Sequence, residues 1–403
     1  MKKRNLKKVV ISNKGEKSIL LGHPWIYAGE IENSDAITDG EIVDVVNKKD
    51  KYLGSGFYNS HSKIIVRLIS RNANDMFDSE FFRRRIRYAI DYRLSVMGDE
   101  LNSFRVIFGE ADELPGLTVD KFNDILVVQI LSLGIEERKD MILKLLYEEI
   151  SKDFNISGIY IRNDVDIREK EGMKQYKGWY DLGKNIPKST KTEIIENDIK
   201  YVVDFENGQK TGFFLDQKYN RLFIRKIARN RNVLDCCTHT GSFAMNAFLG
   251  GAKKVTAMDI SSKALEDSCE NFKLNNMNID TICGDVFDVL KELSEKKNKE
   301  YDFIILDPPA FTKSRKTINS ALKGYQEINY LALKSLPRGG FFATASCSHF
   351  ATPDLFLNAV YKASIDAGVK LKQVGYFGAS YDHPVLIGVE ETRYLKFYVF
   401  QVI

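Results

Sequence analysis

Residues 231–260, with the sequence RNVLDCCTHTGSFAMNAFLGGAKKVTAMDI, determine the architecture of the C-terminal half of this chain. Apolar residues lead into Asp235, a loop of small residues ends at Gly241, and an apolar run over 243–249 stops at a pair of glycines. A second apolar run then ends at Asp259. This order predicts a strand, a loop, a helix and a second strand, the repeating unit of a parallel sheet covered by helices.

The loop and the end of the second strand are expected to face one ligand, because ligands of parallel sheets bind outside the carboxyl ends of the strands. A carboxylate at that strand end can accept hydrogen bonds from both ribose hydroxyls of an adenosine. The loop has Gly241 alone where a dinucleotide-binding loop has three glycines, so it offers no cradle for a pyrophosphate. Unless the unit is purely structural, we therefore expect S-adenosylmethionine, an adenosine without phosphates, and not NAD. The expected contacts are Asp235, Cys236, Thr240, Gly241, Asp259 and Ile260.

The length of 403 residues exceeds one typical core, which predicts a multidomain protein. Hydrophobic residues make up 44% and charged residues 28%, and no apolar run approaches the roughly 20 residues that span a bilayer, so we expect no membrane partner. The five cysteines include no C-x-x-C pair, which favours free thiols in a reducing compartment over disulfides or zinc. With no cleavage signal at the N-terminus, a cytoplasmic protein is expected.

Residues 1–73 form the first expected domain, a small β-rich fold of short apolar runs separated by turn signals. They carry 13 Lys and Arg against 8 Asp and Glu, an excess of +5 that indicates either an RNA partner or a solvated basic face. His23 and Trp25 can stack on RNA bases or hydrogen-bond to them, although Trp25 fits a small core equally well.

Residues 74–190 form the second expected domain, an α+β segment without a nucleotide motif. Ser79 is expected to cap a helix with an apolar stripe on one side and Arg83, Arg84, Arg87 and Arg93 on the other. These arginines either contact RNA or form a solvated face. Glu110, Asp112 and Glu113 follow turn chemistry, and no histidine flanks them, so no metal site is expected.

Residues 191–403 form the third expected domain, which contains the stretch over 231–260. Asn207 and Gly208 predict a hairpin turn between two strands. The apolar run over 301–306 is followed by Asp307, Pro308, Pro309, Ala310 and Phe311. Two prolines directly after a strand stiffen the backbone. Such a loop could hold Asp307 and the prolines against a planar base, with Phe311 stacked on it. The last strands are expected near 385–387 and 394–402.

Cys347 follows an expected strand over 341–346, which puts it at the carboxyl end of the sheet beside the D-P-P loop. A cysteine at this position would suit methylation of cytosine at C5, a carbon that by itself attacks a methyl sulfonium poorly. Addition of a thiolate to C6 makes C5 enamine-like, and after methyl transfer a base removes the C5 proton and the thiol is eliminated. Asp307 and His349 are candidates for that base. The alternative is a buried structural cysteine.

Several motifs together resemble one family. GHPWIY at 22–27, with DGEIVDV and GSGFYN after it, is similar to a PUA RNA-binding domain. KTGFFLDQ at 210–217, the loop after Asp235, DPPAF and SCS at 346–348 resemble the PUA-containing class I methyltransferases that modify cytosine C5 in large-subunit ribosomal RNA. The resemblance implies a Rossmann-like α/β catalytic domain and further cofactor contacts from Phe214, Asp216, Asp285 and Asp307. It also implies that Cys347 is the nucleophile.

Other functions stay open at this stage. The D-P-P loop could instead receive an exocyclic amine of a purine, which would leave Cys347 idle, and uracil C5 needs the same thiolate chemistry as cytosine. A non-catalytic RNA-binding or ribosome assembly protein is the alternative from another class. Many cytosine-C5 RNA enzymes carry a second cysteine beside their D-P-P-like motif, and this chain has none there. The resemblance allows a homodimer, which the residues alone do not predict.

Overall fold

The computed structural model describes residues 5–312 and 314–403, and the chain divides into two compact units. The first unit comprises Met1–Ile194, Val203–Leu215 and Tyr381–Thr392, and the second comprises Ile195–Val202, Asp216–Ser380 and Arg393–Ile403. The two domains expected before residue 190 thus fall in one unit, and their boundary at residue 73 stays a prediction.

The N-terminal part of the first unit is a mixed sheet with strand order β2-β6-β5-β4-β1-β3. Neighbouring strands are antiparallel except for the parallel pair β1 and β4. Its core consists of alternating apolar residues such as Val9, Val43, Val45 and Val66, which confirms the expected β-rich fold. The elements are β1 (Lys8–Ile11), α1 (Asn13–Leu20), β2 (Trp25–Tyr27), β3 (Ile31–Ser34), β4 (Ile42–Val46), β5 (Tyr52–Tyr58) and β6 (Ile64–Ser70).

The central part of the same unit is a sheet with strand order β11-β10-β9-β8-β7, in which β9 and β10 are parallel. Helix α2 begins after Asp78, whose side chain accepts a hydrogen bond from Phe81 N, so the expectation that Ser79 is the cap is wrong by one residue. The elements are α2 (Ser79–Val96), β7 (Ser103–Phe108), β8 (Leu117–Phe122), β9 (Ile125–Ile130), α3 (Leu133–Glu136), α4 (Lys139–Ile150), β10 (Gly158–Asn163), α5 (Ile167–Lys170) and β11 (Tyr176–Trp179).

The arginines of α2 pair with carboxylates of their own unit. Arg83 pairs with Glu80, Glu148 and Glu149, Arg84 with Asp75, and Arg87 with Asp91 and Asp153. Arg93 was expected on the polar face, but it is fully buried and bound to both oxygens of Asp112. A buried guanidinium needs such a carboxylate to offset its desolvation, and helical periodicity does not reveal that partner.

A short hairpin joins the units in sequence. β12 (Lys191–Glu196) pairs with β13 (Ile199–Asp204) across a turn at Asn197 and Asp198, both with positive φ. The hairpin expected at 207–208 is wrong, since no strand forms in the described segment 209–214. Asp204 accepts hydrogen bonds from the backbone amides of the three residues at 206–208 through its side chain and carbonyl, so the chain turns on itself there.

The second unit is built on a sheet with strand order β16-β15-β14-β17-β18-β20-β19. The strands from β16 to β18 are parallel, and β20 is antiparallel to both β18 and β19. Its elements are α6 (Lys218–Ile227), β14 (Asn232–Cys236), α7 (Ser242–Leu249), β15 (Lys254–Asp259), α8 (Ser262–Leu274), β16 (Asp280–Cys283), α9 (Val286–Glu295), β17 (Phe303–Leu306), α10 (Ile318–Lys334), β18 (Phe341–Ser346), α11 (Pro353–Asp366), β19 (Leu371–Phe377) and β20 (Lys396–Val402).

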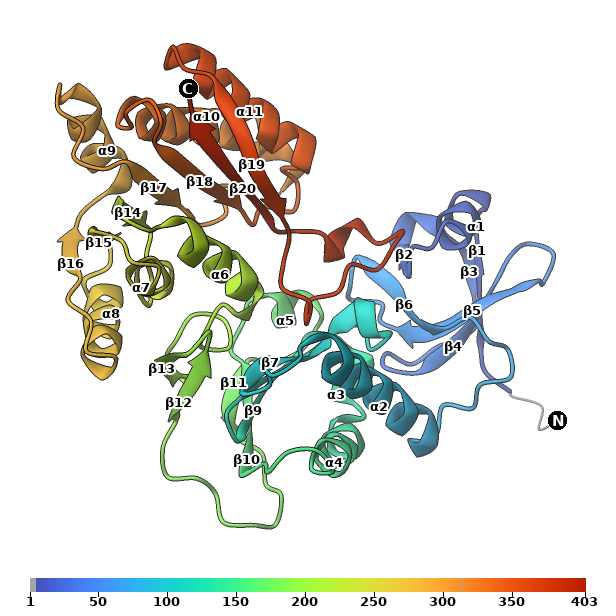
Figure 1. The fold of residues 1–403 in the computed structure, drawn as a ribbon. Helices are drawn as coiled ribbons and strands as arrows, with labels where there is room; N and C mark the ends of the chain where they lie inside the picture. The colour runs from blue at the N-terminus through green and yellow to red at the C-terminus, as the bar shows by residue number, and fades with distance from the viewer. Residues whose placement is uncertain (1–4, 313) are drawn as a thin grey trace. The chain divides into compact units, whose positions relative to one another are not determined.

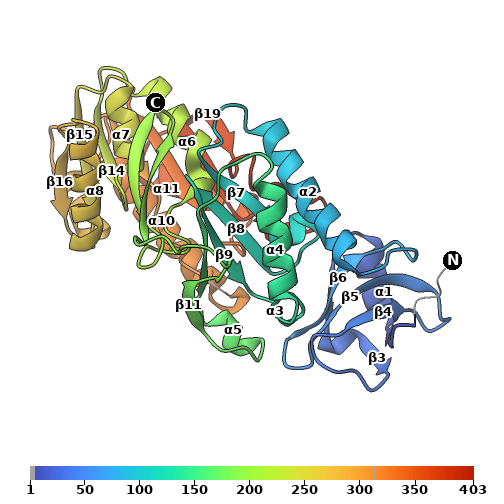
Figure 2. The ribbon, with the colours of Figure 1, turned by 90° about the horizontal axis from the view of Figure 1, so that it is seen from below.

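Helices cover both faces of this sheet, with α6, α7 and α8 along one face and α9, α10 and α11 along the other (Figures 1 and 2). Apolar residues of α10 and α11 pack on β14, β17 and β18 in one continuous core. The Rossmann-like α/β domain is thus confirmed. The strand expected near 385–387 is wrong, because no strand forms in that described segment, and the strand beside β20 is β19, earlier in the chain.

Candidate cofactor and catalytic site

The parallel strands of the second unit end at one edge of the sheet. Cys236 lies opposite Leu306, Leu306 lies opposite Thr344, and Asp259 lies opposite Cys283 in register. Because the strands are parallel, the loops that follow β14, β15, β17 and β18 all begin at this edge. The loop over 237–241, Asp259, the D-P-P loop and Cys347 therefore share one side of the sheet, as the sequence predicted.

The loop over 237–241 has a backbone that few residues adopt easily. Cys237, His239 and Gly241 have φ values of 62°, 52° and 78°. The amide of Thr238 donates to Met258 O at 2.9 Å and the amide of His239 to Asp259 Oδ2 at 3.0 Å. A Cβ at position 241 would lie 2.4 Å from the ring of Phe272 on α8. This glycine therefore permits both the turn and the close packing of the loop on α8.

Asp235 stabilises this loop through hydrogen bonds. Its side chain is fully buried, and Oδ2 accepts from Thr238 Oγ1 at 2.5 Å and from Ala244 N at 3.0 Å. Burial is the main cause that raises the pKa of Asp235 to about 7, and the charges of Asp307 and Asp259 act in the same direction. Among the described residues, Oδ1 has no hydrogen-bond partner. Asp235 Oδ1 can therefore accept a hydrogen bond, or donate one when it is protonated, with a group outside the described residues.

Asp259, Ile260 and Asp285 offer a surface that suits an adenosine. Asp259 receives amide hydrogens from Ser261 on Oδ1 and from His239 on Oδ2, both at 3.0 Å, which orients the carboxylate and leaves it capacity for further donors. Ile260 is 68% exposed beside it. Asp285 is exposed and caps α9 by accepting from Phe287 N. The two carboxylates can accept hydrogen bonds from the ribose hydroxyls and the adenine amino group, and Ile260 can pack on the adenine ring. This combination fits S-adenosylmethionine.

Three further residues were expected at the cofactor, and the structure engages each of them elsewhere. The side chain of Cys236 lies in the apolar core, where burial raises its pKa, so only its backbone is available to a ligand. Thr240 is buried, and its carbonyl accepts from Asn271 Nδ2. Asp216 is buried and accepts a 2.6 Å hydrogen bond from the hydroxyl of Tyr394. The cofactor contacts of Cys236, Thr240 and Asp216 stay predictions.

Phe214 belongs to the first unit, where the Lys210 ammonium lies 4.5 Å from the centre of its ring. The neighbouring Phe213 is buried, as expected for one member of this pair. The contact of Phe214 with the cofactor stays a prediction.

Asp307 is held by a residue that the sequence analysis did not single out. Gln217 Nε2 donates to Asp307 Oδ2 at 2.9 Å, and Gln217 Oε1 accepts from Asn220 Nδ2 at 2.6 Å. Gln217 is almost fully buried, so its amide has a fixed orientation. Its position as the last residue of KTGFFLDQ was the available signal.

The aromatic ring of the D-P-P loop packs inward. Phe311 stacks on Tyr325 with 4.5 Å between ring centroids and an interplanar angle of 26°. On its other neighbour, Phe287, the centroid distance is 6.3 Å. Tyr325 of α10 thus packs on the Phe311 ring, and stacking of Phe311 on a substrate base stays a prediction. Pro308 is buried, and Pro309 is exposed and available to substrate.

Cys347 directly follows β18 and is partly exposed. The serines on either side of it bind one buried hydroxyl, since Tyr325 OH lies 3.0 Å from Ser346 Oγ and 2.8 Å from Ser348 Oγ. Lys396 Nζ donates to Ser348 O at 2.7 Å. The residues on both sides of Cys347 are therefore held by hydrogen bonds from Tyr325 of α10 and Lys396 of β20. Sequence reasoning missed both Tyr325 and Lys396, and no local motif marks them.

Family models match two parts of the chain: a PUA-like domain over residues 9–71 and an S-adenosylmethionine-dependent methyltransferase over residues 182–367. Ribosomal RNA large subunit methyltransferase I of Klebsiella pneumoniae (strain 342) is 36% identical over 394 residues, which cover 96% of each chain. The enzyme of that name from Escherichia coli (strain K12) is 36% identical over 397 residues, 96% of this chain and 98% of the relative. The chain belongs to the ribosomal RNA large subunit methyltransferase I family.

The expected family is thereby confirmed, and this member is an S-adenosylmethionine-dependent methyltransferase. Solved structures support the fold. A protein from Streptococcus mutans described as a SAM-dependent methyltransferase has a TM-score of 0.82 at 23% identity, over 98% of this chain and 100% of that one. A methyltransferase structure complexed with S-adenosylhomocysteine has a TM-score of 0.83 with the same identity and coverage.

In this methyltransferase the two aromatic residues expected to read RNA are engaged within the first unit. Trp25 Nε1 donates to Glu110 Oε1 at 3.0 Å, and the Arg67 guanidinium lies 5.6 Å from the centre of the indole. His23 Nε2 lies 3.5 Å from Glu391 Oε1, and this hydrogen bond is the main cause that raises the pKa of His23. Contacts of His23 and Trp25 with RNA stay a prediction.

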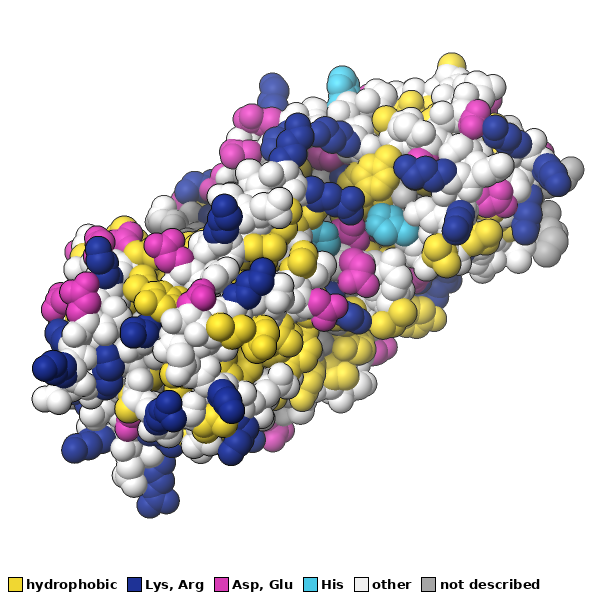
Figure 3. All heavy atoms as spheres, turned by 90° about the horizontal axis from the view of Figure 1, so that it is seen from above, with side chains coloured by type: hydrophobic (Ala, Val, Ile, Leu, Met, Phe, Trp, Pro, Cys, Tyr) yellow, Lys and Arg dark blue, Asp and Glu magenta, His cyan; other side chains and the backbone are white. Residues whose placement is uncertain are grey.

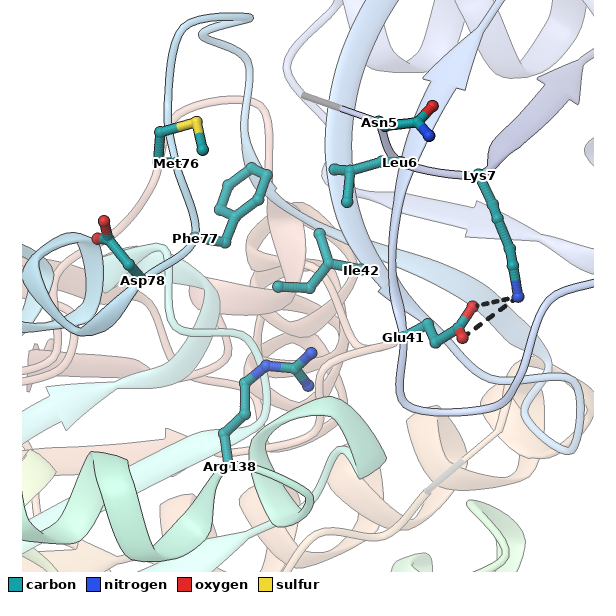
Figure 4. Close-up of a pocket in the computed structure, with 9 residues that line it drawn as sticks. All are labelled: Asn5, Leu6, Lys7, Glu41, Ile42, Met76, Phe77, Asp78 and Arg138. Atoms are coloured by element: carbon teal, nitrogen blue, oxygen red, sulfur yellow. Dashed lines mark hydrogen bonds and ion pairs between the residues drawn. The ribbon is translucent and has the colours of Figure 1, made fainter. Parts of the chain in front are cut away.

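The methyltransferase has a cavity of about 510 Å³ in the first unit, and no expected cofactor residue lines it. Figure 4 shows Leu6, Ile42 and Phe77 around it, with Arg138 on one side and the ion pair of Lys7 and Glu41 on the other. On the face drawn in Figure 3, basic side chains are scattered among acidic ones and form no single basic patch among the described residues.

Residues 5–312 and 314–403 of the methyltransferase contain no helix that is long and apolar enough to cross a membrane. In the same part of the chain, no three His, Cys, Asp or Glu side chains lie together in a way that could hold a metal ion.

Proposed function

We propose that this methyltransferase forms 5-methylcytidine in large-subunit ribosomal RNA through a covalent bond between Cys347 and cytosine C6. The observation that carries the proposal is the partly exposed thiol at the carboxyl end of β18, one strand from the D-P-P loop that follows β17. The relatives that are 36% identical are named for large-subunit ribosomal RNA, and the PUA-like model over 9–71 supports an RNA partner.

In this mechanism the Cys347 thiolate adds to C6, and the electron pair of the C5–C6 bond makes C5 nucleophilic. S-adenosylmethionine supplies the methyl group. Asp259, Asp285 and the loop over 237–241 hold the donor, and the buried Asp235 keeps that loop in shape. A base then removes the C5 proton, and elimination of the Cys347 thiolate restores the aromatic ring.

Asp307 and His349 are the two proposed bases for the C5 proton. Gln217 fixes one of the Asp307 oxygens at the edge of the sheet where Cys347 begins its loop. His349 lies two residues after Cys347 and contacts Phe350 edge-on. Substitution of each in turn separates them, because loss of the base permits addition to C6 but blocks release.

The target cytosine must be accessible from both C6 and C5. A base paired inside a helix exposes neither to a protein pocket, so the substrate is a flipped or single-stranded nucleotide. We place the enzyme in the cytoplasm with its RNA and propose domains at 1–73, 74–190 and 191–403. A homodimer is part of this proposal, and sedimentation equilibrium of the full chain tests it.

Methylation of unmodified ribosomal RNA with S-adenosylmethionine, followed by nucleoside analysis, tests the reaction. Wild type is expected to yield 5-methylcytidine, and Cys347→Ala is expected to lose activity by roughly a thousandfold or more. The matched control is Cys269→Ala, a partly exposed cysteine on α8, which should be active. An N-methylpurine product, or an active Cys347→Ala variant, would instead support transfer to an exocyclic amine.

The covalent bond has a test of its own. RNA with 5-fluorocytidine lacks the C5 proton whose loss precedes elimination, so the adduct should accumulate and survive denaturing electrophoresis. Cys347→Ala should form no such complex. If it forms one, another nucleophile carries the adduct.

A further inference from the structure

Lys396 lies beneath the loop that carries Cys347. It is the first residue of β20 and pairs with Ser346, the last residue of β18, across the antiparallel register. Its side chain is fully buried, and Nζ donates to Ser348 O at 2.7 Å and to Tyr394 O at 2.8 Å. Figure 1 shows β18 and β20 as neighbours in the sheet. The amino group is thus bonded to the residue directly after the nucleophile.

A fully buried lysine ordinarily has an anionic partner, because burial penalises an unpaired ammonium. Among the described residues, no carboxylate forms an ion pair with Lys396, and its two acceptors are neutral carbonyls. Burial lowers the pKa of Lys396 to about 8, and the Cys347 thiolate is the group that opposes this shift. The other titratable groups near the loop are Tyr325, His349 and Asp307. Tyr325 is neutral because burial raises its pKa. His349 lies two residues after Cys347, and Asp307 follows the neighbouring strand β17.

We propose that Lys396 is a positioning residue for the nucleophile, whose ammonium stabilises Cys347 as a thiolate. At neutral pH Lys396, with a pKa of about 8, is mainly an ammonium, so the Cys347 thiol releases its proton to water as the thiolate forms beside that charge. A cation beside a cysteine favours the thiolate, the form that adds to a carbon centre. The inference deepens the proposed function, since it explains how the Cys347 nucleophile is activated at neutral pH.

A purely structural lysine would have a different signature. If Lys396 only tied β20 to the carbonyls of Ser348 and Tyr394, its loss would loosen the loop and alter access to the thiol. Access sets the limiting rate of alkylation at high pH, whereas the charge of Lys396 sets the pH at which the thiolate forms. The two roles are therefore separated by one pH profile.

The experiment is alkylation of the full chain with iodoacetamide between about pH 6 and about pH 10, with the Cys347 peptide quantified by mass spectrometry. Wild-type Cys347 is expected to react with a midpoint below the ordinary value of about 8.5. In Lys396→Met the midpoint should rise, and the rate at neutral pH should fall about tenfold with an unchanged high-pH limit. The exposed Cys283 in the same samples is the internal reference. The exposed Lys372→Met is the matched variant.

Equal midpoints in wild type and Lys396→Met would overturn the proposal, as would a wild-type midpoint at or above about 8.5. Lys396→Gln keeps a hydrogen-bond donor without the charge and gives the same comparison if Lys396→Met does not fold. The wild-type measurement stands in either case.

Alkylation needs neither RNA nor cofactor, so it is independent of the proposed reaction. Suppose that Cys347→Ala is active and that the alkylation midpoint of Cys347 differs between wild type and Lys396→Met. Cys347 would then not be the nucleophile, but the effect of Lys396 on its thiolate would stand. An inactive Cys347→Ala enzyme with equal midpoints would support the nucleophile and overturn the effect of Lys396. If both proposals hold, methyl transfer by Lys396→Met should recover as the pH is raised, which a merely loosened loop would not do.

Discussion

Tyr325 contacts both the D-P-P loop and the loop that carries Cys347. Its ring is stacked 4.5 Å from the ring of Phe311, and its hydroxyl lies 2.8 Å from Ser348 Oγ. Phe311 belongs to the D-P-P loop, and Ser348 directly follows Cys347. The side chain is fully buried on α10, so it has little freedom to follow either loop alone. One residue thus contacts both the D-P-P loop and the residue next to Cys347, the proposed nucleophile.

Tyr325→Phe should uncouple these loops without emptying the core. The ring stack remains, while the hydroxyl that serves both serines is lost, at a cost of about 1 kcal/mol in the free energy of unfolding. We expect kcat to fall about tenfold because Cys347 is less well positioned. Steady-state methyl transfer and urea denaturation measure the two effects. Tyr330→Phe on the same helix is the matched control, and equal kcat values for the two variants would contradict the role of Tyr325.

Gly241→Ala should destabilise the cofactor loop. Position 241 has φ +78°, and its Cβ would lie 2.4 Å from the ring of Phe272. Gly339 has φ +86° with nothing near a Cβ, so Gly339→Ala carries the backbone strain without the clash. We expect about 1 kcal/mol of destabilisation for Gly339→Ala and several for Gly241→Ala, with S-adenosylmethionine binding weakened only in the latter. Thermal unfolding and titration calorimetry measure both, and equal losses would argue against the Phe272 contact.

Asp259→Ala should weaken S-adenosylmethionine with little effect on folding. The carboxylate is only partly buried and is oriented by two backbone amides, so its remaining acceptor sites are available to ribose hydroxyls. We expect the Kd of both S-adenosylmethionine and S-adenosylhomocysteine to rise about tenfold or more, since a hydrogen-bonded charged group contributes about 1.5–3 kcal/mol. Asp280→Ala, exposed at the start of β16, is the control. An unchanged Kd would remove Asp259 from the cofactor site.

Asp235 predicts a pH dependence of stability with a definite sign. Its pKa is raised to about 7 in the folded chain from an ordinary value of 3.8, so between these pH values the folded state binds more protons than the unfolded state. This contribution to stability is fully present below about pH 4 and is lost as the pH rises to about 7, by at most about 1.4 kcal/mol per pH unit.

Asp235→Asn cannot ionise and should lack this loss. Relative to wild type, the variant is expected to gain stability steadily between about pH 4 and about pH 7 and to hold a constant difference above that. Urea denaturation across this range measures the difference. A difference that does not change with pH would show that Asp235 does not titrate there.

Residues at the ends of predicted strands could be found from the sequence because the information is local. The apolar runs that end at Asp259, Leu306 and Ser346 become β15, β17 and β18 with nearly the expected bounds. In a parallel sheet these ends meet at one edge whatever the details of packing. The edge position of Asp259, the D-P-P loop and Cys347 follows from periodicity and strand direction together.

Partners from distant elements could not be found in this way. Arg93 was expected to face solvent, but Asp112 draws it into the interior, and Trp25 was expected to face RNA or a core, but Glu110 binds its indole. The polar partner lies 19 residues away in the first case and 85 in the second, and only the folded chain shows that it is within hydrogen-bond distance.

The sequence by itself indicated the Rossmann-like domain, S-adenosylmethionine and Cys347 as the proposed nucleophile, from residue types at the ends of strands together with the family resemblance. The tertiary structure decided how that cysteine is held. Tyr325 and Lys396 reach its loop from α10 and β20 because α10 packs on the sheet and β20 pairs in register with β18. Register and packing are properties of several segments at once, so no local pattern encodes them.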